Sequence, residues 1–197
     1  MGIIKILFHG RPPLVRRAPV DAARKRATPI HSVRRKFLLR GTEYSVTLKP
    51  AALRNGLTLQ EQTMVVALHP PTRENFEQFM TGWYRRQARQ AYEEAISRWL
   101  PQFHAAGYPL PPPRLKIFAM RRAWGRCYYT KGLITMNLHL VKAPDPCIDY
   151  IILHELCHFV VNNHSREFYR LVEQFMPSWR EADLLLKNFA REKRIIR

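Results

Sequence analysis

Residues 150–179, YIILHELCHFVVNNHSREFYRLVEQFMPSW, constrain the fold more than any other part of the chain. The apolar runs around His154 and His158 predict a buried helix. Histidines four residues apart lie about 40° apart around a helix and about 6 Å apart along it, so both imidazoles can face one point. These imidazoles and the carboxylate of Glu155 are costly inside a core unless they are paired or hold a metal ion. The segment is therefore either a metal site or a plain core helix whose histidines are satisfied by hydrogen bonds.

A third histidine, His164, favours the metal site. On a continuous helix it would lie about 15 Å beyond His154, too far to share an ion. The chain must therefore reverse, and we predict the turn at Asn162 and Asn163 because asparagine tolerates the left-handed conformation. Ser165 is the predicted N-cap of a second helix. This helix would have Glu167 in its first turn and an inner face of Phe168, Leu171, Val172 and Phe175.

The three histidines match the needs of a catalytic zinc ion, which takes three protein ligands and keeps one position open. We predict one zinc ion per chain, bound by His154, His158 and His164. Glu155 is the predicted general base, which takes a proton from a metal-bound water and returns it to the leaving group. We assign Cys157 to packing, because buried cysteine is common and three histidines suffice.

The rest of the chain alternates between strand and helix signals. The runs KFLLR, EYSVTLKP and TMVVALH predict a small antiparallel meander. Thr72 is the predicted N-cap of a long amphipathic helix over residues 73–99, either continuous or broken near Gly82. RLKIFAM, WGRCYY and LITMNLHLV predict further strands, with a turn at residues 130–132. This order predicts an α+β fold, with a small antiparallel sheet packed on the long helix and on the helix that carries the HExxH motif.

Length and charge suggest one domain with a basic extension. A chain of 197 residues suits a single domain, which we predict over residues 31–197. Residues 1–30 are rich in Arg and Pro and lack sustained apolar periodicity, which predicts a flexible extension. The net charge is +18, and the first 50 residues hold 12 Lys or Arg against two acidic residues. This excess favours a nucleic acid or another anionic partner, although a solvated tail explains it equally well.

The sequence offers no sign of a membrane or secreted protein. No run approaches the roughly 18 to 20 apolar residues that a membrane span needs, and the first ten residues do not form a secretory signal. The three cysteines, Cys127, Cys147 and Cys157, form no paired framework and fit a reducing compartment. We predict no disulfide, no membrane partner and a cytoplasmic location.

An ordered set of motifs resembles the YgjP-like metal-dependent hydrolases. The set consists of WGRC at residues 124–127, a KG…N hairpin, H-E-L-C-H-x5-H-S-x-x-F from His154 and EQFMPSW at 173–179, and the likeness runs from residue 32 to residue 189. These hydrolases are zincin-type metallopeptidases related to SprT-like and WLM-type proteases. The resemblance implies a zincin-like fold, metal ligands at His154, His158 and His164, and a catalytic base at Glu155.

The chain departs from the family pattern at the hairpin. The family's usual W-G-S-C is here Trp124-Gly125-Arg126-Cys127, followed by two tyrosines. In zincins this hairpin borders the cleft, where an extended substrate can add as a strand. The resemblance implies substrate contacts at Trp124, Arg126, Asn137 and Tyr169. Arg126 and the tyrosines either alter substrate preference or are surface changes, and the candidates for stabilising the oxyanion are Tyr169, Arg126 and Arg170.

These observations predict a zinc metallopeptidase acting on a peptide or protein substrate. One alternative is a nucleoside triphosphate pyrophosphatase acting on UTP, which the positive charge suits. No carboxylate cluster for magnesium accompanies the motif, however, and phosphate chemistry with magnesium usually uses one. Another alternative is a DNA-associated protease, as among SprT-like relatives.

Overall fold

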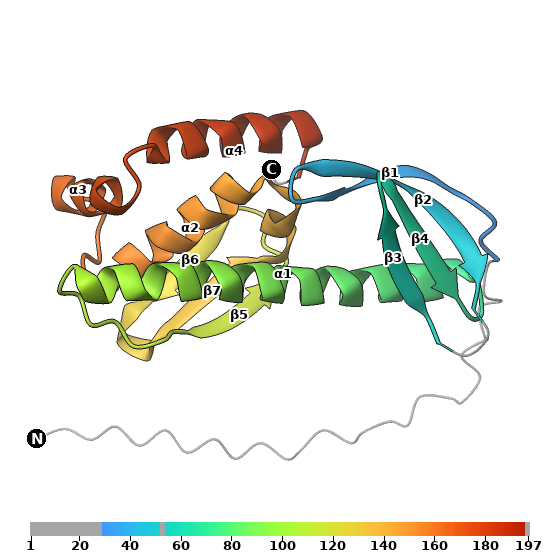
Figure 1. The fold of residues 1–197 in the computed structure, drawn as a ribbon, viewed down its shortest axis with the longest axis horizontal. Coiled ribbons are helices and arrows are strands. Elements are labelled where there is room, and N and C mark those ends of the chain that lie inside the picture. Colours follow the sequence, from blue (N-terminus) through green and yellow to red (C-terminus); the bar gives the residue numbers. More distant parts are fainter. Residues whose placement is uncertain (1–28, 52–53, 196–197) are drawn as a thin grey trace, which may run out of the picture.

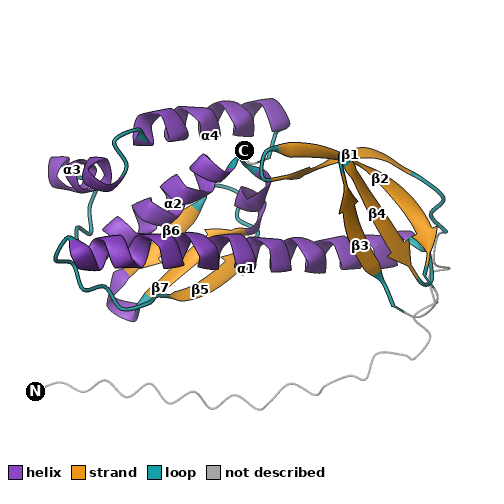
Figure 2. Ribbon diagram, in the orientation of Figure 1, coloured by secondary structure: helices purple, strands orange, loops and turns teal. Residues whose placement is uncertain are grey.

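The computed structural model describes residues 29–51 and 54–195. Most of the predicted basic extension, residues 1–28, lies outside the described residues. A long helix, α1, runs through the molecule, with one small sheet near its first half and a second sheet near its second half (Figure 1). The two sheets and four α-helices of the described residues confirm the predicted α+β class (Figure 2).

The first sheet is not the predicted antiparallel meander. It contains β1 (Val33–Leu39), β2 (Thr42–Pro50), β3 (Gly56–Gln60) and β4 (Thr63–Leu68), in the order β1-β2-β4-β3. The unpredicted strand β3 forms a hairpin with β4, and this brings β4 back parallel to β2. The buried side chains Met64, Val66 and Leu68 alternate along β4, which suits a central strand with one face on the core. β3 is a mostly exposed edge strand, so its sequence carries little apolar signal.

Helix α1 (Arg73–Ala105) is continuous and longer than predicted. Its predicted N-cap is confirmed, because the Thr72 hydroxyl accepts a hydrogen bond from the Asn75 N–H at 3.2 Å. The helix passes through Gly82 without a break and ends six residues after the predicted end. A glycine inside a helix costs only about 1 kcal/mol, and the core packing of this helix offsets that cost. Its core side chains include Phe76, Met80, Trp83, Tyr92, Ile96 and Phe103.

The second sheet contains β5 (Arg114–Phe118), β6 (Gly125–Tyr128) and β7 (Leu133–Asn137), in the order β5-β7-β6. β5 and β7 are parallel and β6 and β7 antiparallel, so this sheet is also mixed. The predicted turn before β7 is present, formed by η1 (Tyr129–Lys131) and a left-handed Gly132. β7 ends at Asn137, earlier than predicted, because the Asn137 side chain caps η2 (Leu138–Lys142) by accepting from the His139 N–H at 3.1 Å.

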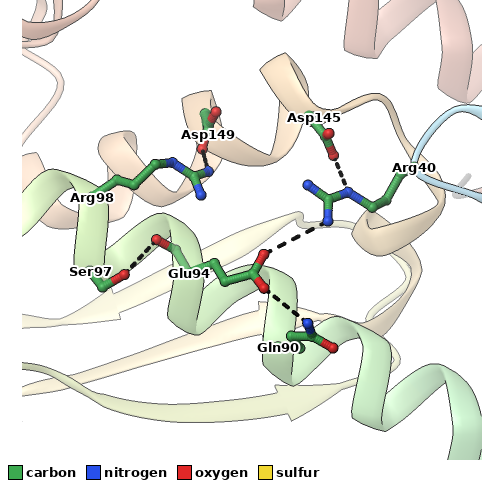
Figure 3. Close-up of polar contacts among 7 residues, drawn as sticks. All are labelled: Arg40, Gln90, Glu94, Ser97, Arg98, Asp145 and Asp149. Carbon is green, nitrogen blue, oxygen red and sulfur yellow. Dashed lines mark hydrogen bonds and ion pairs between the residues drawn. The ribbon is translucent and has the colours of Figure 1, made fainter.

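The remaining helices are α2 (Asp145–Cys157), α3 (Arg166–Phe175) and α4 (Trp179–Lys193). α2 contacts α1, α3, α4, η2 and β6. Figure 3 shows ion pairs that link the first half of α2 to α1 and to Arg40 beside β1; they join Arg40 to Glu94 and Asp145, and Arg98 to Asp149. Because these side chains are largely solvated, each pair contributes at most about 1 kcal/mol. Their effect is to orient α2 on α1.

Membrane-spanning helices and disulfide bonds, both predicted to be absent, can be examined in the described part of the chain. None of its helices combines the length and apolar character that a membrane span requires. Cys127, Cys147 and Cys157 are free thiols, and the latter two are buried.

The hydroxyl of Tyr92 ties α1 to the end of β7. It donates a buried hydrogen bond of 2.7 Å to the Asn137 carbonyl oxygen. Tyr92→Phe keeps the ring and removes this bond, so we expect the free energy of unfolding to fall by about 1–2 kcal/mol. Urea denaturation measures this change, with Tyr128→Phe on the exposed side of β6 as the matched control. Equal denaturation midpoints for all three proteins would refute the role assigned to this bond.

Candidate metal centre

Helix α2 carries two of the three histidines on an otherwise apolar segment. Pro146 in its first turn suits a helix start, where a missing N–H costs nothing. From Cys147 onward nearly every side chain is buried, which fixes the helix on all sides. The helix ends at Cys157, with His158 as its C-cap, so His154, Glu155 and His158 occupy its final turn.

The predicted chain reversal after His158 is present, but it begins earlier than predicted. The N–H groups of Val160 and Val161 both donate to the Cys157 carbonyl oxygen, which turns the chain immediately after the helix. Neither Asn162 nor Asn163 has a positive φ, so the predicted left-handed turn at these residues is wrong. A tight turn made by the valine backbone removes the need for a left-handed residue.

Asn163 contributes to the turn through its side chain instead. Its Oδ1 accepts from the Ser165 N–H at 3.1 Å, and this bond orders the segment around His164. Ser165 then caps α3 as predicted, because its hydroxyl accepts from the Phe168 N–H at 3.4 Å. Glu167 lies in the first turn of α3 and Phe168, Leu171 and Val172 are buried, also as predicted.

The reversal brings three imidazoles to one point. Nε2 of His164 lies 3.0 Å from Nε2 of His154 and 3.2 Å from Nε2 of His158. Two nitrogen ligands on a tetrahedral zinc ion lie about 3.3 Å apart. The ring of Phe168 lies beside all three imidazoles, with centroid separations of 4.8, 4.5 and 4.9 Å. The buried Phe168 therefore limits how far the three rings can turn.

Without a bound cation, the three imidazole nitrogens cannot all make favourable contacts with one another. His158 donates its Nδ1 proton to the Val161 carbonyl oxygen at 3.2 Å, so its Nε2 carries a lone pair. Burial, followed by the charges of His158 and His164, lowers the pKa of His154 to about 3. Burial also lowers the pKa of His158. When the rings are neutral, only one of the two short Nε2–Nε2 contacts can be a linear hydrogen bond. A metal ion would instead bind the lone pair of each of the three Nε2 atoms.

The histidines are the one group of possible metal ligands found in the described part of the chain, and neither Cys157 nor a carboxylate belongs to it. His164 is exposed and the other two are half-buried, so the centre faces solvent on one side. Burial raises the pKa of the Cys157 thiol to about 12. This agrees with its predicted role in packing, since a thiolate is the form that binds metal.

Glu155 follows His154 on α2 and lies against strand β6. Only 5% of it is exposed, and burial raises the pKa of its carboxyl to about 8, although a backbone hydrogen bond from Cys127 acts in the opposite direction. A divalent cation nearby would favour the carboxylate form. The side chain is thus held near the centre in an environment that makes its protonation sensitive to the metal.

The approach of Glu155 to β6 depends on Gly125. A Cβ atom placed on Gly125 would lie 2.7 Å from both Cγ and Cδ of Glu155, and nearer still to Oε1. Only glycine leaves this space for the carboxylate. This role was not predicted for Gly125, although a glycine inside a strand often marks the close approach of another group.

Strand geometry separates Arg126 from the centre. Gly125 and Cys127 are half-buried towards Glu155, whereas Arg126 and Tyr128 are exposed on the opposite face of β6. Arg126 lines an open surface depression with the arginines at 121 and 122. The structure therefore does not bring Arg126 to the reacting centre, and it is removed as a candidate for stabilising the oxyanion.

Asn137 is fully buried and does not reach a substrate. Its amide nitrogen donates to the carbonyl oxygens of Met120 and Ala123, each at 2.8 Å, and its Oδ1 accepts from the Met120 N–H at 3.2 Å. The predicted substrate contact is wrong, because the polar atoms of this side chain order the segment before β6. Trp124 belongs to the same segment, where its carbonyl oxygen accepts from the Asn137 N–H at 2.8 Å.

Tyr169, which is also predicted to contact substrate, lies beside His164. Its ring centroid is 6.3 Å from that of His164, and the ring stacks on Trp179 at 5.2 Å. Its exposed fraction is 36%, so part of the residue is accessible to solvent. Arg170, the remaining candidate for the oxyanion, is exposed on α3.

Comparison with known proteins identifies the family. The model of the family described as YgjP-like, metallopeptidase domain, matches residues 16–189. The chain belongs to the YgjP-like family. As a YgjP-like metallopeptidase domain it is expected to hold a catalytic metal ion, and His154, His158 and His164 form a group able to bind one.

Other comparisons place few proteins beside this YgjP-like domain. Among solved structures it is similar to the metallopeptidase zymogen abylysin of Pyrococcus abyssi, with 22% identity and a TM-score of 0.42. The similarity covers 55% of this chain and 97% of that chain. A comparison with curated proteins found no match.

Gly125→Ala tests the packing of Glu155 on β6. The added methyl group must displace the carboxylate, so we expect peptidase activity to fall by about tenfold or more while metal content is unchanged. The matched control is Gly82→Ala, where the nearest atom outside the helix backbone is 3.7 Å from the added Cβ, and this variant should keep full activity. Wild-type activity in Gly125→Ala would show that Glu155 does not need its observed position.

Proposed function

We propose that this YgjP-like domain is a zinc-dependent peptidase in which Glu155 is the general base. The observation that carries the proposal is the convergence of three Nε2 atoms at the final turn of α2, which also carries the buried carboxylate of Glu155. One side of this centre is open to solvent. Three protein ligands with an open position are typical of catalytic zinc sites, whereas structural sites use four. Three imidazole nitrogens at this spacing also favour zinc over magnesium or calcium, which prefer oxygen ligands.

Each residue of the centre has a separate role in this proposal. A zinc ion held by His154, His158 and His164 would supply Lewis-acid chemistry, polarising the scissile carbonyl and acidifying a water molecule. Glu155 would accept the proton from that water at its carboxylate and later deliver it to the leaving amine. Tyr169 is the candidate to donate a hydrogen bond to the developing oxyanion, because it is a partly exposed hydroxyl-bearing residue whose ring lies beside that of His164.

The substrate path in this proposal is the free edge of β6. β6 pairs with β7 on one side and is an edge strand of its sheet, and its backbone passes directly beside Glu155. An extended peptide could add to this edge through backbone hydrogen bonds. Peptide bonds along such a strand would pass close to the metal centre, which supports a peptide or protein substrate.

The pyrophosphatase alternative receives less support. No group of possible metal ligands in the described residues contains a carboxylate, as magnesium chemistry on phosphates would require.

The free thiols of Cys127, Cys147 and Cys157 fit the reducing cytoplasm, which we propose as the location of the protein.

Replacement of Glu155 separates metal binding from catalysis. We expect wild type and Glu155→Gln each to bind about one zinc ion. Cleavage of an unfolded protein should fall by about 10³-fold or more in Glu155→Gln, because the amide cannot accept the proton. Metal analysis and a cleavage assay measure these properties, with UTP as the rival substrate. Hydrolysis of UTP without peptide cleavage would replace the proposed activity with the alternative one.

Replacement of His158 tests the ligand set. His158→Ala leaves two ligands, so we expect loss of zinc and of activity together. The control is His31→Ala, since His31 is exposed and outside the group of possible ligands. If His158→Ala kept both zinc and activity, the assignment of the metal centre would be wrong.

A further inference from the structure

A second site of unusual charge lies away from the metal centre. A cavity of about 400 Å³ is lined by β1, the first half of α1, η2 and the end of α4. Five lysine or arginine side chains and one carboxylate, that of Glu77, line it. Positive side chains gathered around a cavity repel one another, so this arrangement favours an anion between them.

Two of the five cations already have acidic partners. Arg35 donates to both carboxylate oxygens of Glu77 at 2.9 Å, and Lys193 pairs with Glu43 at 2.6 Å. The other three, Lys36, Lys142 and Arg194, form no ion pair with any residue in the described part of the chain. Two of the cations around the cavity are thus held by acidic side chains, and the other three are free to bind a ligand as far as the described residues show.

Lys142 is the most informative of these residues. Its side chain is half-buried, and its Nζ lies 5.4 Å from the centroid of the Tyr84 ring. Burial, and secondly the charge of Arg35, lowers its pKa. A lysine held out of water and close to another cation needs compensation, which an anion would supply.

His139 adds a second unpaired group to the same wall. It precedes Lys142 on η2, lines the cavity, and has a buried Nδ1 atom without a hydrogen-bond partner. Burial, followed by the charge of Lys142, lowers the pKa of the ring. Because Nδ1 is inaccessible, only Nε2 of this ring could donate to a ligand oxygen in the cavity.

We propose that this cavity binds a phosphate-bearing anion through Lys142, Lys36 and Arg194. A phosphoryl group carries up to two negative charges and several acceptor oxygens, which suits three cations that line one cavity. The volume also lies in the range of small-ligand sites, roughly 300–1,000 Å³. The phosphoryl group belongs either to a small free ligand or to a nucleic acid backbone.

This site is separate from the metal centre. η2 lies just before the first turn of α2, whereas the metal-binding histidines lie at the end of α2 and beyond. The 13 residues of α2 span about 20 Å. Binding at Lys142 therefore does not depend on the proposed peptidase mechanism.

Titration calorimetry of the full zinc-loaded chain tests the proposal with two probes, inorganic pyrophosphate and a single-stranded oligonucleotide. We expect Lys142→Met to weaken binding of at least one probe by about tenfold, as the loss of one charge-assisted contact implies. Lys116→Met is the matched control, because Lys116 is exposed on β5 and outside the cavity, and it should change the affinity by less than about twofold.

A second variant guards against an effect on folding. Arg194 is exposed and has a φ of 50°, so Arg194→Asn removes the charge and keeps a residue that tolerates this conformation. This variant should weaken binding of the same probe that Lys142→Met binds less tightly. If pyrophosphate bound at the zinc ion and not in the cavity, neither variant would change its affinity.

The pattern of binding decides the outcome. Loss of pyrophosphate binding in the two variants identifies a small free ligand, and loss of oligonucleotide binding alone identifies a nucleic acid backbone. The proposal is overturned if wild type binds neither probe, or if Lys142→Met and Arg194→Asn bind both as tightly as Lys116→Met.

Discussion

His154, His158 and His164 direct their Nε2 atoms to one point, and much of the surrounding structure depends on this convergence. Neutral imidazoles at such separations cannot all be satisfied by hydrogen bonds, so other contacts must hold the rings in place. The Val161 carbonyl orients His158, and the buried ring of Phe168 lies beside all three. The centre is therefore prepared for a cation before one binds.

The position of Glu155 is set through a longer series of contacts. Tyr92 on α1 donates to the Asn137 carbonyl, and the Asn137 amide orders the segment that leads into β6. That segment places Gly125 directly against the Glu155 carboxylate. Helix α1 thus influences the position of Glu155 through Asn137 and β6. This explains why Asn137, fully inside the protein, matters to the site although no substrate reaches it.

The sequence predicted the local features of the site well. The histidine spacing, the cap at Ser165 and the apolar face of α3 depend on neighbouring residues, and such short-range patterns are visible in a sequence. The reversal after α2 was also predictable, because His164 could not reach the other ligands otherwise. Its mechanism was not, since the backbone bonds of Val160 and Val161 leave no sign in the choice of side chains.

Long-range features were harder to predict. The parallel pairing of β2 with β4 follows from β3, an exposed edge strand with weak apolar alternation. Arg126 was predicted to contact substrate because its hairpin borders the cleft in zincins, but alternation along β6 directs it to the opposite face. The role of Gly125 depends on a residue 30 positions later in the chain, so the sequence marks it only as a glycine in a strand.

In the proposed centre, three imidazole nitrogens bind one zinc ion and leave one of its coordination positions open to solvent. X-ray absorption spectroscopy of the zinc-loaded protein measures this coordination directly. We expect three imidazole nitrogens at about 2.0–2.1 Å and one further light ligand from solvent. A sulfur ligand at about 2.3 Å, as Cys157 would supply, or a site with only two imidazoles, would contradict the account.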